Sequence, residues 1–126
     1  MTTATRVAQL LVRAAGVVQL ALGLLLWTGN ARGLVPLHML IGFVLVAGLL
    51  TLAVLAARAG APPALVVLAG AWVLLTPLLG LTQDRLLPGS AHWLVQVLHL
   101  LVGVAAVALA EQLARRTSLR LAGGVA

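Results

Sequence analysis

The fold is decided by residues 33–57, which read GLVPLHMLIGFVLVAGLLTLAVLAA and carry no charged side chain. About 20 apolar residues in a helix cross the hydrocarbon core of a bilayer, so this stretch is long enough to span it. Three further stretches also lack Asp, Glu, Lys and Arg, at residues 14–31, 59–83 and 86–110. The sequence therefore predicts an all-α integral membrane protein with four membrane-spanning helices.

The composition excludes a water-soluble domain of this length. The 126 residues are 63% hydrophobic and 8% charged, with a mean hydropathy of +1.18. Soluble domains are about 45–50% apolar and about 25% charged. The chain has no cysteine, which excludes disulfides and thiolate metal sites. All eight basic residues are arginines at the ends of hydrophobic runs, so we expect a lipid bilayer and no nucleic acid as the partner.

The turn and cap residues between the apolar stretches set the expected helix boundaries. We expect one transmembrane domain over residues 1–126, with helices at about 7–27, 35–58, 63–82 and 91–115. Connections this short force neighbouring helices to be antiparallel, so the expected architecture is an up-down-up-down four-helix bundle. Residues 121–126 are expected to form a frayed tail.

The arginines also predict the orientation. Six of them fall on the side of the two termini and two on the other side: Arg6, Arg13, Arg58, Arg115, Arg116 and Arg120 against Arg32 and Arg85. Cytoplasmic segments of membrane proteins carry the excess of basic residues. We therefore expect a bacterial-type inner membrane protein with both termini on the cytoplasmic side. Glu111 and Arg115 have the i,i+4 spacing of an ion pair on one helix.

Two histidines lie inside the apolar segments, and each is followed by a glycine four residues later. The two copies are His38-Met39-Leu40-Ile41-Gly42 and His99-Leu100-Leu101-Val102-Gly103. Five of ten aligned positions are identical from each histidine onward, which leaves open a duplicated helical hairpin. A histidine in hydrocarbon is costly and therefore indicates a functional site.

The bundle topology predicts that these two histidines face each other. The second and fourth helices run parallel and diagonally across the core, and His38 and His99 differ in depth by about five residues, or about 7 Å. Two imidazoles facing each other across a bundle are the arrangement of a bis-His heme. We therefore expect heme b with His38 and His99 as iron ligands, and with Gly42 and Gly103 leaving room for the ring edge.

Other polar residues leave alternatives open. His92 and Gln96 share a helix face with His99, and His92 is an alternative partner of His38 or of a heme propionate. Arg32 and Arg85 lie in the outer loops, where guanidinium groups suit propionates. Binding of copper or zinc would need all three histidines to converge.

Three functions remain in competition on these residues. The first is a heme-binding cytochrome that transfers electrons. The second is a non-catalytic accessory or assembly subunit in which His and Gln form interhelical hydrogen bonds. The third is a quinone-binding or small-solute carrier module built on His92 and Gln96. No carboxylate pair and no Ser/His/Asp set is present, so we expect an electron-transfer or binding protein rather than an enzyme.

The placement of His38 and His99 on the second and fourth helices resembles one four-helix half of heme A synthase and the small di-histidine b-type membrane cytochromes. In heme A synthase, heme-ligand histidines come from these two helices of each half. The chain lacks the paired cysteines and the acidic residue on the outer side of the first helix that the synthase uses. The resemblance therefore implies a heme-holding bundle, not synthesis of heme A. A quinone or a redox protein stays open as a partner. The oligomeric state stays open.

Overall fold

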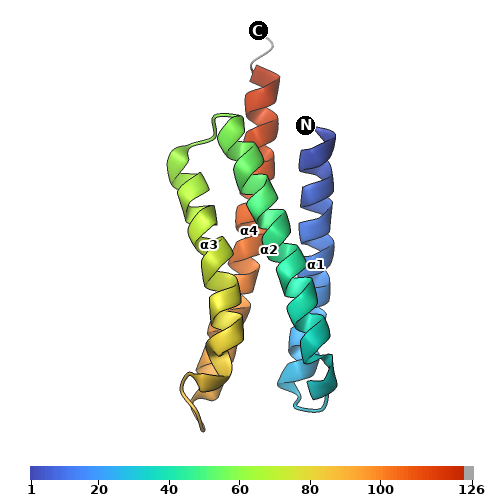
Figure 1. Ribbon diagram of the computed structural model, residues 1–126, viewed down its shortest axis with the longest axis vertical. Coiled ribbons are helices and arrows are strands. Elements are labelled where there is room, and N and C mark those ends of the chain that lie inside the picture. Colours follow the sequence, from blue (N-terminus) through green and yellow to red (C-terminus); the bar gives the residue numbers. More distant parts are fainter. Residues whose placement is uncertain (124–126) are drawn as a thin grey trace.

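The computed structural model describes residues 1–123 and forms an up-down-up-down bundle of four long helices (Figure 1). Their bounds are α1 (Thr3–Trp27), α2 (Val35–Arg58), α3 (Pro63–Thr82) and α4 (His92–Gly123). Two short 3₁₀ helices, η1 (Arg32–Leu34) and η2 (Gln83–Arg85), lie before α2 and after α3. Residues 1–123 contain no strand, and the predicted all-α fold is confirmed.

The helix ends agree with the sequence at α2 and α3 and differ at the two termini. α1 begins at Thr3 instead of residue 7, because the Thr2 hydroxyl caps it by accepting a hydrogen bond from the Thr5 N–H at 3.2 Å. α4 continues to Gly123, so its predicted end at residue 115 is wrong. The frayed tail predicted from residue 121 is wrong for residues 121–123, which are helical. Residues 124–126 of that tail lie outside the described part of the chain.

The added turns of α4 are held by burial on one side. Leu113 and Thr117 are almost fully buried, and the Thr117 hydroxyl donates to the Leu113 carbonyl at 2.8 Å. Hydropathy falls at Arg115 and Arg116, but arginine is a good helix former. The helix therefore continues beyond the point where its sequence stops being apolar.

The two parallel helices, α2 and α4, pack directly against each other, with α1 on one side of them and α3 on the other. Among residues 1–123, α1 and α3 make no contact with each other. α2 and α4 thus form the short diagonal of the bundle. Fully buried alanines of both helices, Ala56, Ala106 and Ala110, supply the small volumes that such a close approach requires.

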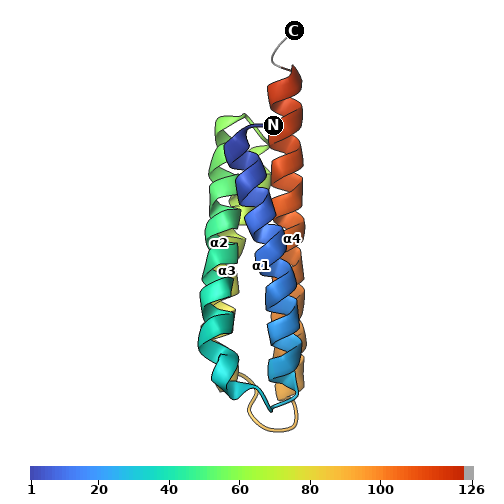
Figure 2. The same ribbon diagram turned by 90° about the vertical axis from the view of Figure 1, so that its right-hand side faces the viewer.

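The core is concentrated in the half of the bundle near the two termini. Its largest fully buried side chains are Leu49, Leu52, Leu113 and Val12, from three helices. Toward the opposite end the buried apolar cluster is small, with Leu79, Val95 and Val102 packed against Trp72. Figure 1 shows that the α1–α2 hairpin separates from α3 and α4 toward this loop end, and Figure 2, turned by 90°, shows α1 in front of α4 and α2 in front of α3.

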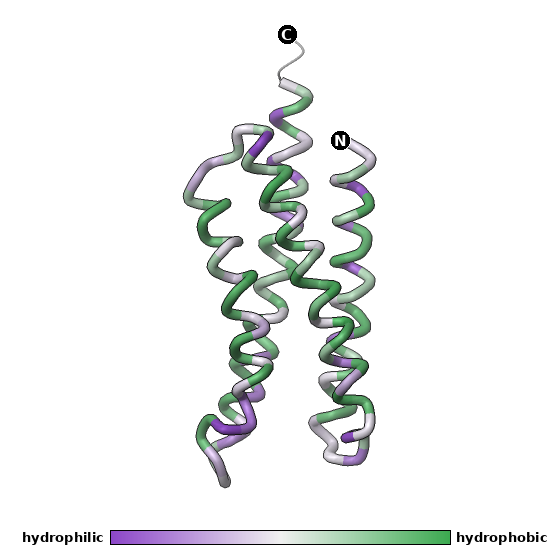
Figure 3. Tube along the Cα trace, in the orientation of Figure 1, coloured by the Kyte–Doolittle hydropathy of each residue, from purple (hydrophilic) through white to green (hydrophobic). Residues whose placement is uncertain are grey.

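All four helices are long and apolar enough to cross a membrane. Their most apolar windows have mean hydropathies of 1.9 to 2.7. Large apolar side chains such as Val17, Leu40, Val67 and Leu74 lie exposed on the outside of the bundle. Figure 3 shows hydrophobic residues along most of each helix and polar ones near the ends. This surface suits a lipid bilayer, and the fold is consistent with a multi-pass membrane protein.

One polar contact joins α3 to α4 within the loop-end cluster. The Trp72 indole N–H donates to the Val102 carbonyl at 3.0 Å. We expect Trp72→Phe to lower the free energy of unfolding by about 1 kcal/mol, because the ring is kept and one hydrogen bond is lost. Denaturant unfolding in mixed micelles measures it, with Trp27→Phe as the exposed control. Equal effects of the two changes would contradict the role of the hydrogen bond.

Candidate functional site

The histidines of α2 and α4 meet in the loop-end half of the bundle. The centroids of the His38 and His99 rings are 6.2 Å apart, and the ring planes are inclined by 55°. His38 lies in the first turn of α2 and His99 at the end of the second turn of α4. The structure thus brings together the two residues that the sequence pairs as ligands.

Three buried polar atoms around these rings have no hydrogen-bond partner. They are Nδ1 of His38, Nδ1 of His99 and Oε1 of Gln19. Each unpaired buried polar group costs about 1–3 kcal/mol, and native structures contain few of them. Two of them belong to the paired rings, and Gln19 lies beside Gly42, one turn of α2 beyond His38. Unpaired buried atoms so near each other are typical of a place where another group binds.

Glycines of the flanking helices lie directly against the two rings. A Cβ built on Gly23 of α1 would be 3.6 Å from Cε1 of His38. A Cβ built on Gly80 of α3 would be 3.2 Å from Cε1 of His99, which is a tight contact. Each imidazole is thus bordered by a backbone without a side chain, and each flanking helix contributes one such position.

The two glycines named by the sequence pattern differ in their surroundings. A Cβ on Gly42 would lie 2.7 Å from Nε2 of Gln19, so the amide of Gln19 already fills the space beside Gly42. A Cβ on Gly103 would have no neighbouring atom within 4 Å. Open space next to the site is therefore found at Gly103 and not at Gly42.

The remaining predicted site residues lie around the pair without reaching it. His92 begins α4, and its Nδ1 forms a 3.2 Å hydrogen bond with the Leu86 carbonyl. Gln96 is half-buried one turn before His99. Arg32 in η1 and Arg85 in η2 are exposed at the same end of the bundle, and neither contacts a histidine by hydrogen bond within residues 1–123. His92 is therefore a loop contact in this structure rather than the partner of His38.

The three histidines do not converge. Within residues 1–123, no group of three or more His, Cys, Asp or Glu side chains is placed to hold a metal ion. Zinc sites built from side chains use three or four protein ligands. The arrangement instead offers two imidazoles facing each other.

The predicted site residues did not include Gly80, Gly23 and Gln19. Gly23 and Gln19 are four residues apart and share one face of α1 with Gly16, a spacing that is visible in the sequence. Gly80 has a weaker signal, since only its depth near the loop end of α3 places it level with His99.

A second polar cluster joins α1 to α4 nearer the termini. Arg13 donates from Nε and Nη2 to the two carboxylate oxygens of Glu111 at 2.6 and 2.7 Å, and Gln9 donates to the same carboxylate at 2.8 Å. The predicted pair of Glu111 with Arg115 is therefore wrong. The planar fork of Arg13 satisfies both oxygens at once, which a neighbour on the same helix does not do here.

Comparison of the chain with known family models, characterised proteins and solved structures finds no match. The site is therefore defined by its own geometry, with two imidazoles on parallel helices, three buried polar atoms without partners and two bordering glycines.

Proposed function

We propose that the protein is a small b-type membrane cytochrome that holds heme b between His38 and His99 and transfers electrons. The observation that carries this proposal is the 6.2 Å between the ring centroids. A coordinating imidazole nitrogen lies about 2 Å from its metal and about 1 Å from its ring centre, so two imidazoles on opposite sides of a metal have centres about 6 Å apart. The spacing of the two ring centres thus supports the proposal of a bis-His iron.

The number of ligands supports heme over an ion that side chains hold alone. A structural or catalytic zinc site uses at least three protein ligands, whereas heme iron needs only two axial ones from the protein. Heme supplies reversible one-electron chemistry when it is bound. Because His38 and His99 would occupy both axial positions, the residues favour electron transfer over oxygen binding.

The alternative of a non-catalytic accessory subunit predicts hydrogen bonds that are missing. In that function, histidine and glutamine would join helices by hydrogen bonds. Neither His38 nor His99 makes one within residues 1–123, and Oε1 of Gln19 is unpaired. A quinone module on His92 and Gln96 is also less favoured, because His92 is engaged with the Leu86 carbonyl.

The loop end of the bundle is where we propose that redox partners approach. Arg32 and Arg85 are exposed there and would pair with propionates. The first turn of α1 and the last described turn of α4 lie at the opposite end (Figure 1), which also carries six of the eight arginines. By the excess of basic residues we propose cytoplasmic termini in a bacterial-type inner membrane, with the histidine pair nearer the outer side and a quinone or redox protein as partner.

The test is the colour of the protein. Protein purified from heme-supplied cells should show sharp Soret and α bands in the reduced-minus-oxidised spectrum, with one heme per chain by pyridine hemochrome assay. A colourless preparation from such cells, which also fails to take up added hemin, would contradict the proposal.

Gly80 provides a finer test of the same site. We expect Gly80→Ala to keep the heme but to alter its low-spin electron paramagnetic resonance, because the new methyl would lie 3.2 Å from Cε1 of His99 and turn or shift the ring by a few tenths of an ångström. The matched control is Gly70→Ala on the same helix, where a Cβ meets nothing within 4 Å. Indistinguishable spectra of the two variants would show that Gly80 does not border the ligand.

A further inference from the structure

Arg115 is left without a partner by the pairing of Glu111 with Arg13. The Glu111 carboxylate accepts hydrogen bonds from Arg13 and Gln9, and this is the one ion pair among residues 1–123. The side chains of Arg115, Arg116 and Gln112 are exposed and form no hydrogen bond within that range. The part of α4 just beyond Glu111 therefore presents two free guanidinium groups and a free amide.

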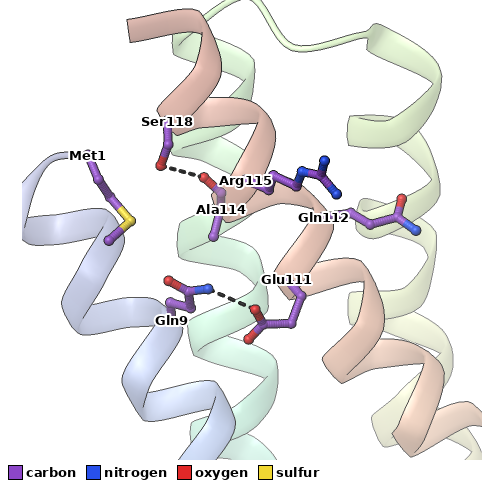
Figure 4. Close-up of a pocket in the computed structure, with 7 residues that line it drawn as sticks. All are labelled: Met1, Gln9, Glu111, Gln112, Ala114, Arg115 and Ser118. Atoms are coloured by element: carbon purple, nitrogen blue, oxygen red, sulfur yellow. Dashed lines mark hydrogen bonds between the residues drawn. The ribbon is translucent and has the colours of Figure 1, made fainter. Parts of the chain in front are cut away.

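These side chains border two adjoining grooves. The first has a volume of about 330 Å³ and is lined by residues of α1 and α4, including Gln9, Glu111, Arg115 and Ser118. The second has a volume of about 340 Å³ and is lined by Gln112, Arg115, Arg116 and Leu119. Arg115 and Gln112 line both grooves. Figure 4 shows these two side chains extending from α4 away from α1, while Gln9 and Glu111 face each other between the helices.

The grooves lie at the depth of lipid headgroups. Gly80 of α3 is level with His99 of α4, so residue 63 is level with residue 116, since both are 17 residues away along antiparallel helices. Pro63 begins α3, and the apolar run of α4 ends at residue 110. Arg115 and Arg116 therefore lie at the boundary where the apolar part of the bundle ends, before the last two turns of α4.

The charge in the grooves is positive. The single carboxylate, Glu111, is neutralised by Arg13, while Arg115 and Arg116 are not neutralised. Basic pockets between membrane helices on the cytoplasmic side bind anionic headgroups, and a guanidinium fork matches two phosphate oxygens. A phosphodiester can therefore accept hydrogen bonds from Arg115, Arg116 and the Gln112 amide together.

We propose that these grooves hold the phosphodiester headgroup of an anionic membrane lipid, with Arg115 at the centre of the site. The headgroup lies against α4 at the terminal end of the bundle, on the side to which Arg115 and Gln112 extend. Its headgroup fixes the projecting end of α4 at the membrane surface. The site is separate from the histidine pair, so a failure of the heme proposal would not affect it.

Native mass spectrometry of the protein in a neutral detergent tests the site, with phosphatidylglycerol and phosphatidylcholine as probes. The unchanged protein should retain one phosphatidylglycerol in preference to phosphatidylcholine. Arg115→Gln should weaken this binding about fivefold, and Arg115→Gln with Arg116→Gln about 25-fold, as expected for about 1 kcal/mol per arginine. Arg58→Gln is the matched control. It removes the same charge at the same end of the bundle, but Arg58 is on α2 and lines neither groove.

Four results would overturn the proposal. Equal weakening by Arg58→Gln and Arg115→Gln would show diffuse attraction to positive charge. Equal retention of the two lipids would show that the site has no preference for an anionic headgroup. Unchanged binding in the double variant would show that the arginines do not hold the lipid. Displacement of the lipid by inorganic phosphate at equal concentration would assign the grooves to a free anion. The heme spectrum of Arg115→Gln, recorded in parallel, is expected to be unchanged.

Discussion

His99→Ala is expected to abolish the Soret and α bands and to give a colourless protein, and His38→Ala to do the same. Each change removes one of two rings whose centroids are 6.2 Å apart, and no third histidine is close enough to replace it within residues 1–123. Loss of a group that only supports a metal ligand costs 10–100-fold in affinity, so loss of the ligand itself should exceed about 100-fold. Hemin titration followed at the Soret band measures the effect.

Two controls separate ligation from packing. His92→Ala should keep the spectrum, because His92 bonds to the Leu86 carbonyl and lies outside the pair. Imidazole added to the His99→Ala protein should restore part of the α band by entering the space of the lost ring. Bleaching by His92→Ala together with an unchanged spectrum in His99→Ala would show that His92 is the partner of His38.

Gly48→Leu is expected to cause the largest loss of stability of any single change considered. A Cβ at this position of α2 would lie 2.6 Å from Cγ2 of Val12 and 3.6 Å from the Ala8 carbonyl oxygen of α1. Val12 is fully buried and has no room to move. Overpacking by a few methylenes costs about 1–3 kcal/mol, and a leucine here should exceed that range by forcing α1 away from α2.

Unfolding by denaturing detergent, followed by circular dichroism, measures this loss. The control is Gly70→Leu, where a Cβ meets no atom within 4 Å, and it should change the free energy of unfolding by less than about 0.5 kcal/mol. Val12→Ala combined with Gly48→Leu should recover part of the loss, because the methyl groups that clash are removed. Equal stability of Gly48→Leu and Gly70→Leu would contradict the close packing of α1 on α2.

The sequence predicts α2 and α3 well because chemical signals coincide at their ends. Pro36 and Pro63 suit first turns, and α2 ends at Arg58, the residue after a long uncharged run. The end of α4 lacks such agreement. Its hydropathy falls at Arg115, but a basic residue stops the membrane span and not the helix, so the hydrogen bonds continue to Gly123.

The histidine pairing was accessible from the sequence because topology and depth decide it. Because α2 and α4 run parallel, His38 and His99 lie in the same half of the bundle, and their depths along the helices differ little. The partner of Glu111 was not accessible in this way. Which of Arg13 and Arg115 reaches the carboxylate depends on how α1 and α4 are rotated about their axes, and this rotation follows from packing such as that of Gly16 on Val107. The same holds for Gly80, because the rotation of α3 about its axis, set by its packing on α4, decides whether Gly80 faces His99.

The two parallel helices at the centre of the bundle, α2 and α4, belong to different helical hairpins. The α1–α2 hairpin carries His38 and the α3–α4 hairpin carries His99, and their one covalent link is the short connection between Arg58 and Pro63. Neither hairpin alone contains both rings. A chain cut at this connection would therefore be a complementation system. Two fragments made separately would form the histidine pair only after they associate in the membrane.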